Sequence, residues 1–149
     1  PTPDVSSAAS DVYKRQAQNL MARRALTALD DSIERQQAAI AWLKNATNAG
    51  DHSSKILLAW ELVTTRHEEL RDAVEALKLV ETELENYYDP LRVLETKAAV
   101  YAEIGDFPKA IKFQKKALKR AKKNKWKISL VKERLAIYEY GEPYRGSYF

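Results

Sequence analysis

Cysteine is absent from this sequence, and its absence excludes several kinds of chemistry. The 149 residues hold no thiol for a disulfide scaffold, for a thiol nucleophile or for a cysteine metal site. Two histidines leave little material for a histidine metal cluster. Four glycines argue against a glycine-rich phosphate loop and against a β-sandwich, which needs many tight turns.

Long apolar runs are missing as well. No stretch of apolar residues approaches the roughly 18 that a membrane-spanning helix needs, so we expect no membrane span. The abundant residues are Ala, Leu, Lys and Glu, and 45% of the chain is hydrophobic while 31% is charged. This composition is typical of an all-helical chain, and the length suits one domain or a short array of repeats.

Positive charge is concentrated in one segment. Residues 109–134 hold 12 of the 25 Lys and Arg but a single acid, Glu133, whereas the whole chain has a net charge of +4. The local net charge of this segment is therefore +11, and the remaining residues sum to −7. A basic surface on a mildly acidic body could meet an anionic partner, although runs of charge more often form a solvated face.

The first 16 residues, PTPDVSSAASDVYKRQ, are rich in Ser, Ala and Asp and show no apolar periodicity. We expect a disordered tail there, and no signal peptide, because no basic start leads into an apolar stretch. Residues 6–16 also resemble the translated adapter read-through that ends some assembled reading frames. On that interpretation the tail is non-native, the native N-terminus is missing and the chain is a C-terminal fragment. We therefore make no prediction of the cellular compartment, because targeting signals would have been lost with the native N-terminus.

From residue 17 onward, apolar residues recur at spacings of three, four and seven, which predicts consecutive helices. No segment alternates with period two, so strands are not expected. The expected helices cover residues 17–44, 55–63, 70–85, 91–104, a stretch that has Pro108 in its first turn, and 128–140. The expected breaks are the polar stretches 45–54 and 64–69, residues 86–90, the turn at 105–106, and Gly141 with Pro143.

Residues 91–118 read LRVLETKAAVYAEIGDFPKAIKFQKKAL, and their pattern resembles a tetratricopeptide repeat, or TPR. The signature positions are held by Leu94, Ala98, Tyr101, Gly105, Phe107, Ala110 and Ala117. In such a repeat, small residues let two antiparallel helices approach while aromatic residues fill the gaps beside them. Three positions depart from the pattern: Lys97 where Leu is usual, Gln114 where an aromatic is usual, and Lys122 where Pro often sits.

Two weaker copies precede this repeat. Ala76 lies 34 residues before Ala110, which is the repeat length, and residues 32–40 parallel residues 110–118. The resemblance implies an all-α fold of antiparallel helical hairpins, stacked as a short right-handed solenoid like those that end many bacterial proteins. The expected parts are a non-native tail (1–16), degenerate or truncated repeat helices (17–50), a TPR-like repeat with an extended turn (51–89), a TPR repeat (90–124), and a closing helix with a C-terminal tail (125–149).

Signals for catalysis are weak. His67 begins a stretch that looks like the zinc-protease pattern HExxH, but the second histidine is missing, so a solvated loop histidine is the better interpretation. Asp51, His52 and Ser53 are triad residue types, yet adjacency in sequence is not triad geometry, and Asp51, Ser53 or Ser54 would serve as a helix N-cap. We therefore expect no catalytic residue, no metal site, no cofactor and no enzyme activity.

The resemblance also implies a concave groove lined by the first helices of neighbouring repeats. Its floor would include Trp60, Arg92, Glu95, Ala99 and Glu103. Some family members grip the C-terminal carboxylate of a peptide at such positions, but Glu95 would repel a carboxylate. The expected ligand is a peptide with an apolar anchor against Trp60 and a basic residue near Glu95 and Glu103. Alternatively, an upstream helix of the parent protein fills the groove, which would make the site structural.

The leading hypothesis is a non-catalytic protein–protein interaction module, C-terminal in a larger bacterial protein, that binds a peptide or a neighbouring domain in this groove. The second is an adaptor that binds nucleic acid or another polyanion through residues 109–134, where Lys112, Lys116, Lys119 and Lys123 form one stripe. The third is a regulatory appendage of an enzyme whose catalytic domain is absent. We rank nucleic acid below a protein partner because no aromatic platform is interleaved with the lysines.

Overall fold

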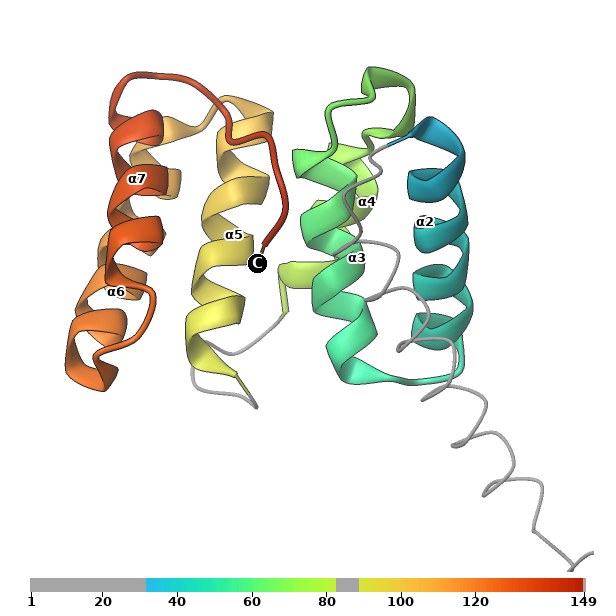
Figure 1. The fold of residues 1–149 in the computed structure, drawn as a ribbon, viewed down its shortest axis with the longest axis horizontal. Coiled ribbons are helices and arrows are strands. Elements are labelled where there is room, and N and C mark those ends of the chain that lie inside the picture. Colours follow the sequence, from blue (N-terminus) through green and yellow to red (C-terminus); the bar gives the residue numbers. More distant parts are fainter. Residues whose placement is uncertain (1–31, 83–88, 149) are drawn as a thin grey trace, which may run out of the picture. The chain divides into compact units, whose positions relative to one another are not determined.

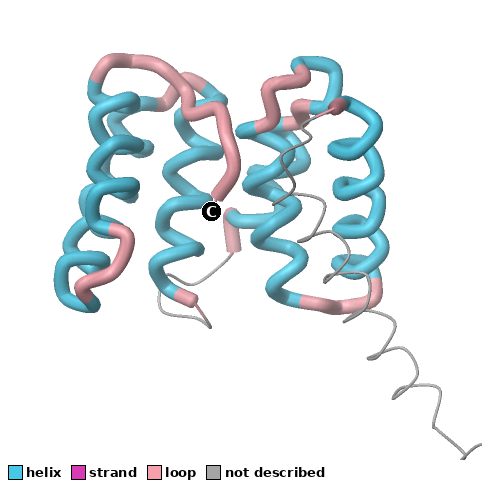
Figure 2. Tube along the Cα trace, viewed as in Figure 1, coloured by secondary structure: helices cyan, strands magenta, loops and turns pink. Residues whose placement is uncertain are grey.

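The computed structural model describes residues 32–82 and 89–148, and every regular element in these two stretches is a helix (Figure 1). The elements are α2 (Ile33–Asn48), α3 (His52–Thr64), the short 3₁₀ helix η1 (Glu68–Leu70), α4 (Ala73–Val80), α5 (Pro90–Ile104), α6 (Phe107–Asn124) and α7 (Ile128–Glu139). Figure 2 shows the loops and turns of the described residues between these helices. The all-α class is thus confirmed for these residues, whereas the segment 1–16 lies outside them.

The chain divides into two compact units, and the division falls inside α3, after Leu58. The described part of the first unit consists of α2 and the start of α3. Apolar side chains of α2 are buried at spacings of one, three and three residues, namely Ala39, Ile40, Leu43 and Ala46. The Asp51 carboxylate accepts a hydrogen bond from the backbone N–H of Ser54 at 3.0 Å, which confirms Asp51 as an N-cap of α3.

Four helix boundaries differ from the sequence prediction by three residues or more. The helix expected at residues 55–63 already begins at His52, and the helix expected to end at residue 85 ends at Val80. The helix expected to end at residue 44 continues to Asn48, because the buried Ala46 extends its apolar face by one more turn. The helix expected to start at Leu70 begins at Ala73, and η1 occupies part of the predicted connection. Its start is set by Asp72, whose side chain accepts a hydrogen bond from the backbone N–H of Glu75 at 3.0 Å.

Three of the four glycines end helices in the same way. Gly50, Gly105 and Gly141 have φ values of 96°, 93° and 81°, in the left-handed region that glycine adopts at little cost. At each, the glycine N–H bonds the carbonyl three residues back, and the next N–H bonds the carbonyl five residues back. The predicted turn at residues 105–106 is one of these Schellman motifs. The end of α6 repeats the pattern with Lys125, at φ 54°.

The second unit, Ala59–Tyr148, is built around the hairpin of α5 and α6. Small residues lie where these helices meet each other and α7. One buried cluster comprises Ala98, Ala102, Ala110 and Tyr138, and the other comprises Leu91, Leu94, Ala117, Ala121 and Val131. Tyr101 and Phe113 stack beside them, with ring centroids 5.6 Å apart and an interplanar angle of 8°. This arrangement of small and aromatic residues is the packing that the sequence predicted for residues 91–118.

Lys97, which replaces the usual leucine of the pattern, is buried in this hairpin. The residue is 8% exposed, and its ammonium lies 5.6 Å from the centroid of the Phe113 ring. The aliphatic stem thus fills the position while the charge meets an aromatic face, which is how a lysine can occupy an apolar site.

Candidate functional site: the face beneath the C-terminal tail

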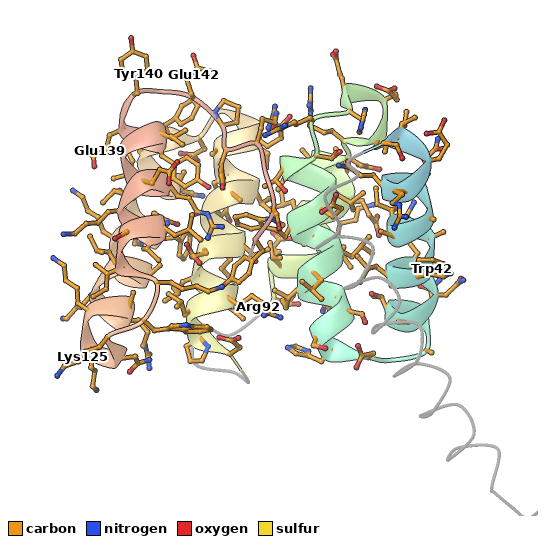
Figure 3. The ribbon with its side chains drawn as sticks, in the orientation of Figure 1. Trp42, Arg92, Lys125, Glu139, Tyr140 and Glu142 are labelled. Atoms are coloured by element: carbon orange, nitrogen blue, oxygen red, sulfur yellow. The ribbon has the colours of Figure 1, made fainter. Side chains whose placement is uncertain are left out.

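After α7 the chain reverses at Gly141, and residues 143–148, here called the C-terminal tail, run back over the helices of the second unit. Figure 1 shows the tail in red, crossing the end of α5 and descending beside it. Tyr140 and Glu142, at the reversal, point away from the helices in Figure 3. The tail itself has no helical structure, and its path can be defined from its contacts.

Hydrogen bonds tie the tail to the last turn of α3. The Gly146 N–H donates to the Thr64 carbonyl at 3.1 Å, and the indole N–H of Trp60 donates to the Gly146 carbonyl at 3.3 Å. The guanidinium of Arg145 donates to the Val63 carbonyl at 3.0 Å. These contacts join residues 82 to 86 positions apart in the sequence, all of them within the second unit.

Three aromatic rings enclose the guanidinium of Arg134, which α7 contributes. The ring of Trp60 meets the rings of Tyr144 and Tyr148 edge-on, with centroids 5.7 and 5.1 Å away. The Cζ atom of Arg134 lies 4.6, 4.8 and 5.1 Å from the centroids of Trp60, Tyr144 and Tyr148. Cation–π attraction of this kind is strongest where water is excluded, as it is here.

The same guanidinium forms a buried ion pair. Arg134 Nη1 donates to Glu95 Oε1 at 2.8 Å, and both side chains are fully buried. Arg134 Nη2 donates to the carbonyls of Tyr148 and Ser147 at 2.8 and 3.2 Å, so the ion pair is also bonded to the tail. The amide of Gln114 supports Glu95 Oε1 with a further hydrogen bond at 3.2 Å.

The environment sets the charge states of these groups. Burial alone would lower the pKa of Arg134, but the charge and hydrogen bond of Glu95 more than offset this, so the pKa is raised and the guanidinium stays charged. Burial raises the pKa of the Tyr148 phenol, and the nearby Glu95 carboxylate raises it further. At neutral pH the cluster therefore holds the charged Arg134 guanidinium and the neutral Tyr148 phenol.

A second, more exposed ion pair holds the tail to α5. Glu103 Oε2 accepts a hydrogen bond from Arg145 Nη1 at 2.6 Å. Its other oxygen, Oε1, lies 3.5 Å from Arg71 Nε, so Glu103 bridges the tail and the segment before α4. The Arg71 side chain also donates to the Thr65 carbonyl at 2.9 Å, which fixes its position.

The five residues predicted to line a groove all lie in α3 or α5. Trp60 and Glu103 bond the tail directly, and Arg92, labelled in Figure 3, lies with Cζ 4.9 Å from the centroid of the Tyr148 ring. Glu95 is connected to the tail through Arg134. Ala99 is buried in α5. The occupant of this face in the structure is the chain's own C-terminal tail.

Sequence reasoning missed several members of this cluster. Arg134 was counted only as part of the basic segment, and Gln114 was noted only as a departure from the repeat pattern. Tyr144, Arg145 and Tyr148 follow Pro143, where no periodicity indicates a structural role. The signal that could have revealed them is chemical: an acid at position 95, directly after the apolar pair Val93 and Leu94, needs a cation as its partner if it is buried.

The predicted lysine stripe lies on the surface of α6. Lys112, Lys116, Lys119 and Lys123, here called the basic row, are all exposed. Trp126 follows in the turn to α7 and is 49% exposed. The Lys127 ammonium lies 4.9 Å from the Trp126 ring centroid, and burial together with the charge of Arg134 lowers the pKa of Lys127.

The remaining candidates from the sequence have local roles. The backbone N–H of His67 donates to Thr65 Oγ1 at 3.3 Å, and its side chain acts electrostatically on the buried Glu61. Burial raises the pKa of Glu61 to about 7, and the charge of His67 opposes this increase.

Within the ranges 32–82 and 89–148, no three potential metal-ligating residues come together, and no helix has the length and apolarity to cross a membrane. The sequence also has two adjacent tyrosines, at positions 87 and 88, which would pack between repeats or stack on a ligand, and they lie outside those ranges.

Comparison with known proteins returns no relative. No family model matches the sequence, and the searches of curated proteins and of solved structures give no significant match. The likeness to the TPR pattern therefore depends on the residues themselves.

Proposed function

We propose that this chain is a non-catalytic protein–protein interaction module, built of TPR-like helical hairpins, whose tail-binding face recognises an extended peptide. The tail-binding face comprises Trp60, Val63 and Thr64 of α3, Glu95 and Glu103 of α5, and Arg134 of α7. In the present state the chain's own C-terminal tail occupies this face. An external peptide or a neighbouring domain would bind by displacing it.

The observation that carries the proposal is the way in which the tail is held. Its backbone accepts from Trp60 and Arg134 and donates to Thr64, so part of the recognition uses groups that any extended peptide possesses. Recognition of extended peptides commonly combines main-chain hydrogen bonds, which supply affinity, with side-chain contacts, which supply specificity.

The side chains of the tail have the chemistry that the sequence predicted for a ligand. Tyr144 and Tyr148 pack against Trp60, where an apolar anchor was expected, and Arg145 pairs with Glu103, where a basic residue was expected. The tail is therefore a model of the partner: an extended segment with two aromatic residues four positions apart and an arginine beside the first. Buried aromatic and arginine anchors are the residues that usually dominate binding energy.

The test uses the full chain and a fluorescently labelled peptide of sequence PYRGSYF, which copies residues 143–149. Arg145→Glu places a second acid beside Glu103 and should loosen the tail by repulsion. We expect the peptide to bind this variant at least 10-fold more tightly than the wild type, as measured by fluorescence anisotropy. A peptide in which the arginine is replaced by glutamate should not bind.

Two further variants make the result decisive. Lys132→Glu changes the net charge by the same amount as Arg145→Glu, but at an exposed position of α7, and it should leave peptide binding at the wild-type level. Tyr148→Ala loosens the tail without changing its charge and should admit the peptide as Arg145→Glu does. If neither loosened variant binds the peptide better than the wild type, the tail is a structural closure only and the proposal is wrong.

A further inference from the structure

The basic row lies on the exposed side of α6, and the turn after it contacts the tail through Lys127, whose ammonium lies 5.0 Å from the Tyr148 ring centroid. The row runs along α6, and its four lysines are spaced by four, three and four residues, so they lie on one side of the helix. From Lys112 to Lys123 the row extends about 17 Å at the usual helical rise. The ammonium groups of Lys112 and Lys116 lie 6.0 and 5.6 Å from the Phe113 ring, which keeps both near the same stretch of helix.

This surface has a strong excess of positive charge. Residues 109–134 hold twelve Lys and Arg against one acid, Glu133. Arg134 is buried and paired with Glu95, whereas Lys115, Lys122 and Lys125 are exposed beside the row. Like charges three and four residues apart on a helix repel one another and are mildly destabilising. The partner that complements such a surface is a polyanion.

The turn that follows the row has an unusual backbone. Lys125 and Lys127 have φ values of 54° and 53°, and they are the positive-φ residues other than glycine in the described part of the chain. Lys125 occupies the helix-ending position that glycine holds at residues 50, 105 and 141. A left-handed conformation is unfavourable for a residue with a side chain, and such strain clusters at functional sites.

Between these two lysines the turn presents Trp126 to solvent. The indole is 49% exposed, and it follows the last lysine of the row by three residues. Lys127 covers one side of the ring with its ammonium at 4.9 Å. An exposed tryptophan at the end of a row of lysines supplies the aromatic group whose absence among the lysines counted against nucleic-acid binding at the level of sequence.

We propose that the basic row together with Trp126 binds single-stranded nucleic acid. The lysines contact successive phosphates, and the indole of Trp126 stacks on one unpaired base. Charge complementarity alone would also suit an anionic bilayer. However, Trp126 is the single exposed large apolar residue of α6 and the turn, which offers little area for insertion into lipid. This proposal does not depend on the function proposed for the tail-binding face.

The experiment measures binding of the full chain to a labelled 12-nucleotide oligothymidine by fluorescence anisotropy. Four phosphate contacts on a single strand predict that log K falls with log salt at a slope near −3, so raising salt from 50 to 200 mM weakens binding about 50-fold. The variant K112Q/K116Q/K119Q/K123Q should lose most of this slope and at least 10-fold in affinity at 50 mM salt. The charge-matched control R35Q/K44Q/R66Q/K78Q should retain both.

The stacking contact is tested separately. Trp126→Ala should weaken binding to oligothymidine by about 5- to 150-fold and leave binding to an abasic oligomer of equal length unchanged. Tyr140→Ala removes a more exposed aromatic residue at the end of α7 and should have no effect. With the wild type, the abasic oligomer should bind more weakly than oligothymidine, a comparison that requires no variant.

Three results would overturn the proposal. The first is equal binding of oligothymidine by the basic-row variant and its charge-matched control. The second is equal binding of the normal and abasic oligomers by the wild type. The third is binding to phosphatidylserine vesicles at a protein concentration that leaves oligothymidine unbound, which would identify an anionic bilayer as the partner instead.

Discussion

At the scale of single residues, the buried ion pair between Glu95 and Arg134 is the most consequential feature. A charge that is moved from water into a protein interior costs several kcal/mol unless it is paired and hydrogen-bonded. Here the carboxylate has both Arg134 and Gln114 as donors, and the guanidinium has two tail carbonyls besides the acid. The pair makes the tail's position dependent on α5 and α7 together.

Replacement of Arg134 by Met should lower the free energy of unfolding by about 3–5 kcal/mol, because Glu95 is left buried without its cation. The double variant Glu95→Leu with Arg134→Met should recover more than half of that loss, since it leaves no buried charge. Urea unfolding followed by tryptophan fluorescence measures both. Lys132→Met, exposed on the same helix, should change stability by no more than about 0.5 kcal/mol. A double variant that is no more stable than the single one would contradict this account.

Glu61 should make stability depend on pH. Its pKa is raised from 4.5 to about 7 by burial, while in the unfolded chain it ionises near the ordinary value. Below pH 4.5 both states are protonated, so its contribution is fully present there. As pH rises from 4.5 through 7, only the unfolded chain releases the proton, and stability falls by about 3 kcal/mol in total.

Glu61→Gln cannot ionise and should remove this decline. The variant should be more stable than the wild type at pH 8, and the difference should shrink as pH falls to 4.5. Urea unfolding at four pH values across this window measures the difference. Parallel stability curves for the two proteins would show that Glu61 ionises normally in the folded state.

At the scale of elements, the helix ends explain much of the chain's glycine usage. Gly50, Gly105 and Gly141 all supply the left-handed residue of a Schellman motif, and Lys125 takes that position at the end of α6. A Cβ at Gly105 would meet no atom within 4 Å, so the requirement for glycine there comes from the backbone and not from packing.

Lys125→Gly should therefore stabilise the protein by about 1 kcal/mol, because it relieves the left-handed strain of a residue with a side chain. Lys123→Gly, two residues earlier and inside the helix, should destabilise the protein by a similar amount, because glycine is unfavourable in a helix. Thermal unfolding monitored by circular dichroism compares the two. A loss of stability in Lys125→Gly would mean that the lysine side chain makes contacts worth more than the strain.

At the scale of the whole molecule, the C-terminal tail connects segments of the second unit that are far apart in the sequence. Its bonds to Trp60 and Val63 join residues separated by 86 and 82 positions, so the second unit is completed only when its last residues are in place. Local helix formation alone cannot hold such a segment, because ordering it costs conformational entropy that only tertiary contacts offset.

Tyr148→Ala should cost about 3 kcal/mol, since Tyr148 is 3% exposed and packs against Trp60 and Arg134. The loosened tail should also lose hydrogen-exchange protection at the Gly146 amide, which bonds the Thr64 carbonyl. Amides in the middle of α6 should lose only the hydrogen-exchange protection that corresponds to the loss of global stability. Retained protection at Gly146 would show that the tail stays bound without its tyrosine anchor.

The sequence by itself determined the helices, both ends of α5 and α7, and the hairpin of α5 and α6. These depend on apolar spacing, capping residues and glycines within a few positions of one another, which are local and therefore readable. Only the tertiary structure decided what covers Trp60 and Glu103, because that depends on Arg134, Tyr144 and Arg145 meeting residues 39 to 84 positions away. Such meetings are selected by burial, charge pairing and aromatic contact between distant segments, and these interactions leave no periodic trace in the chain.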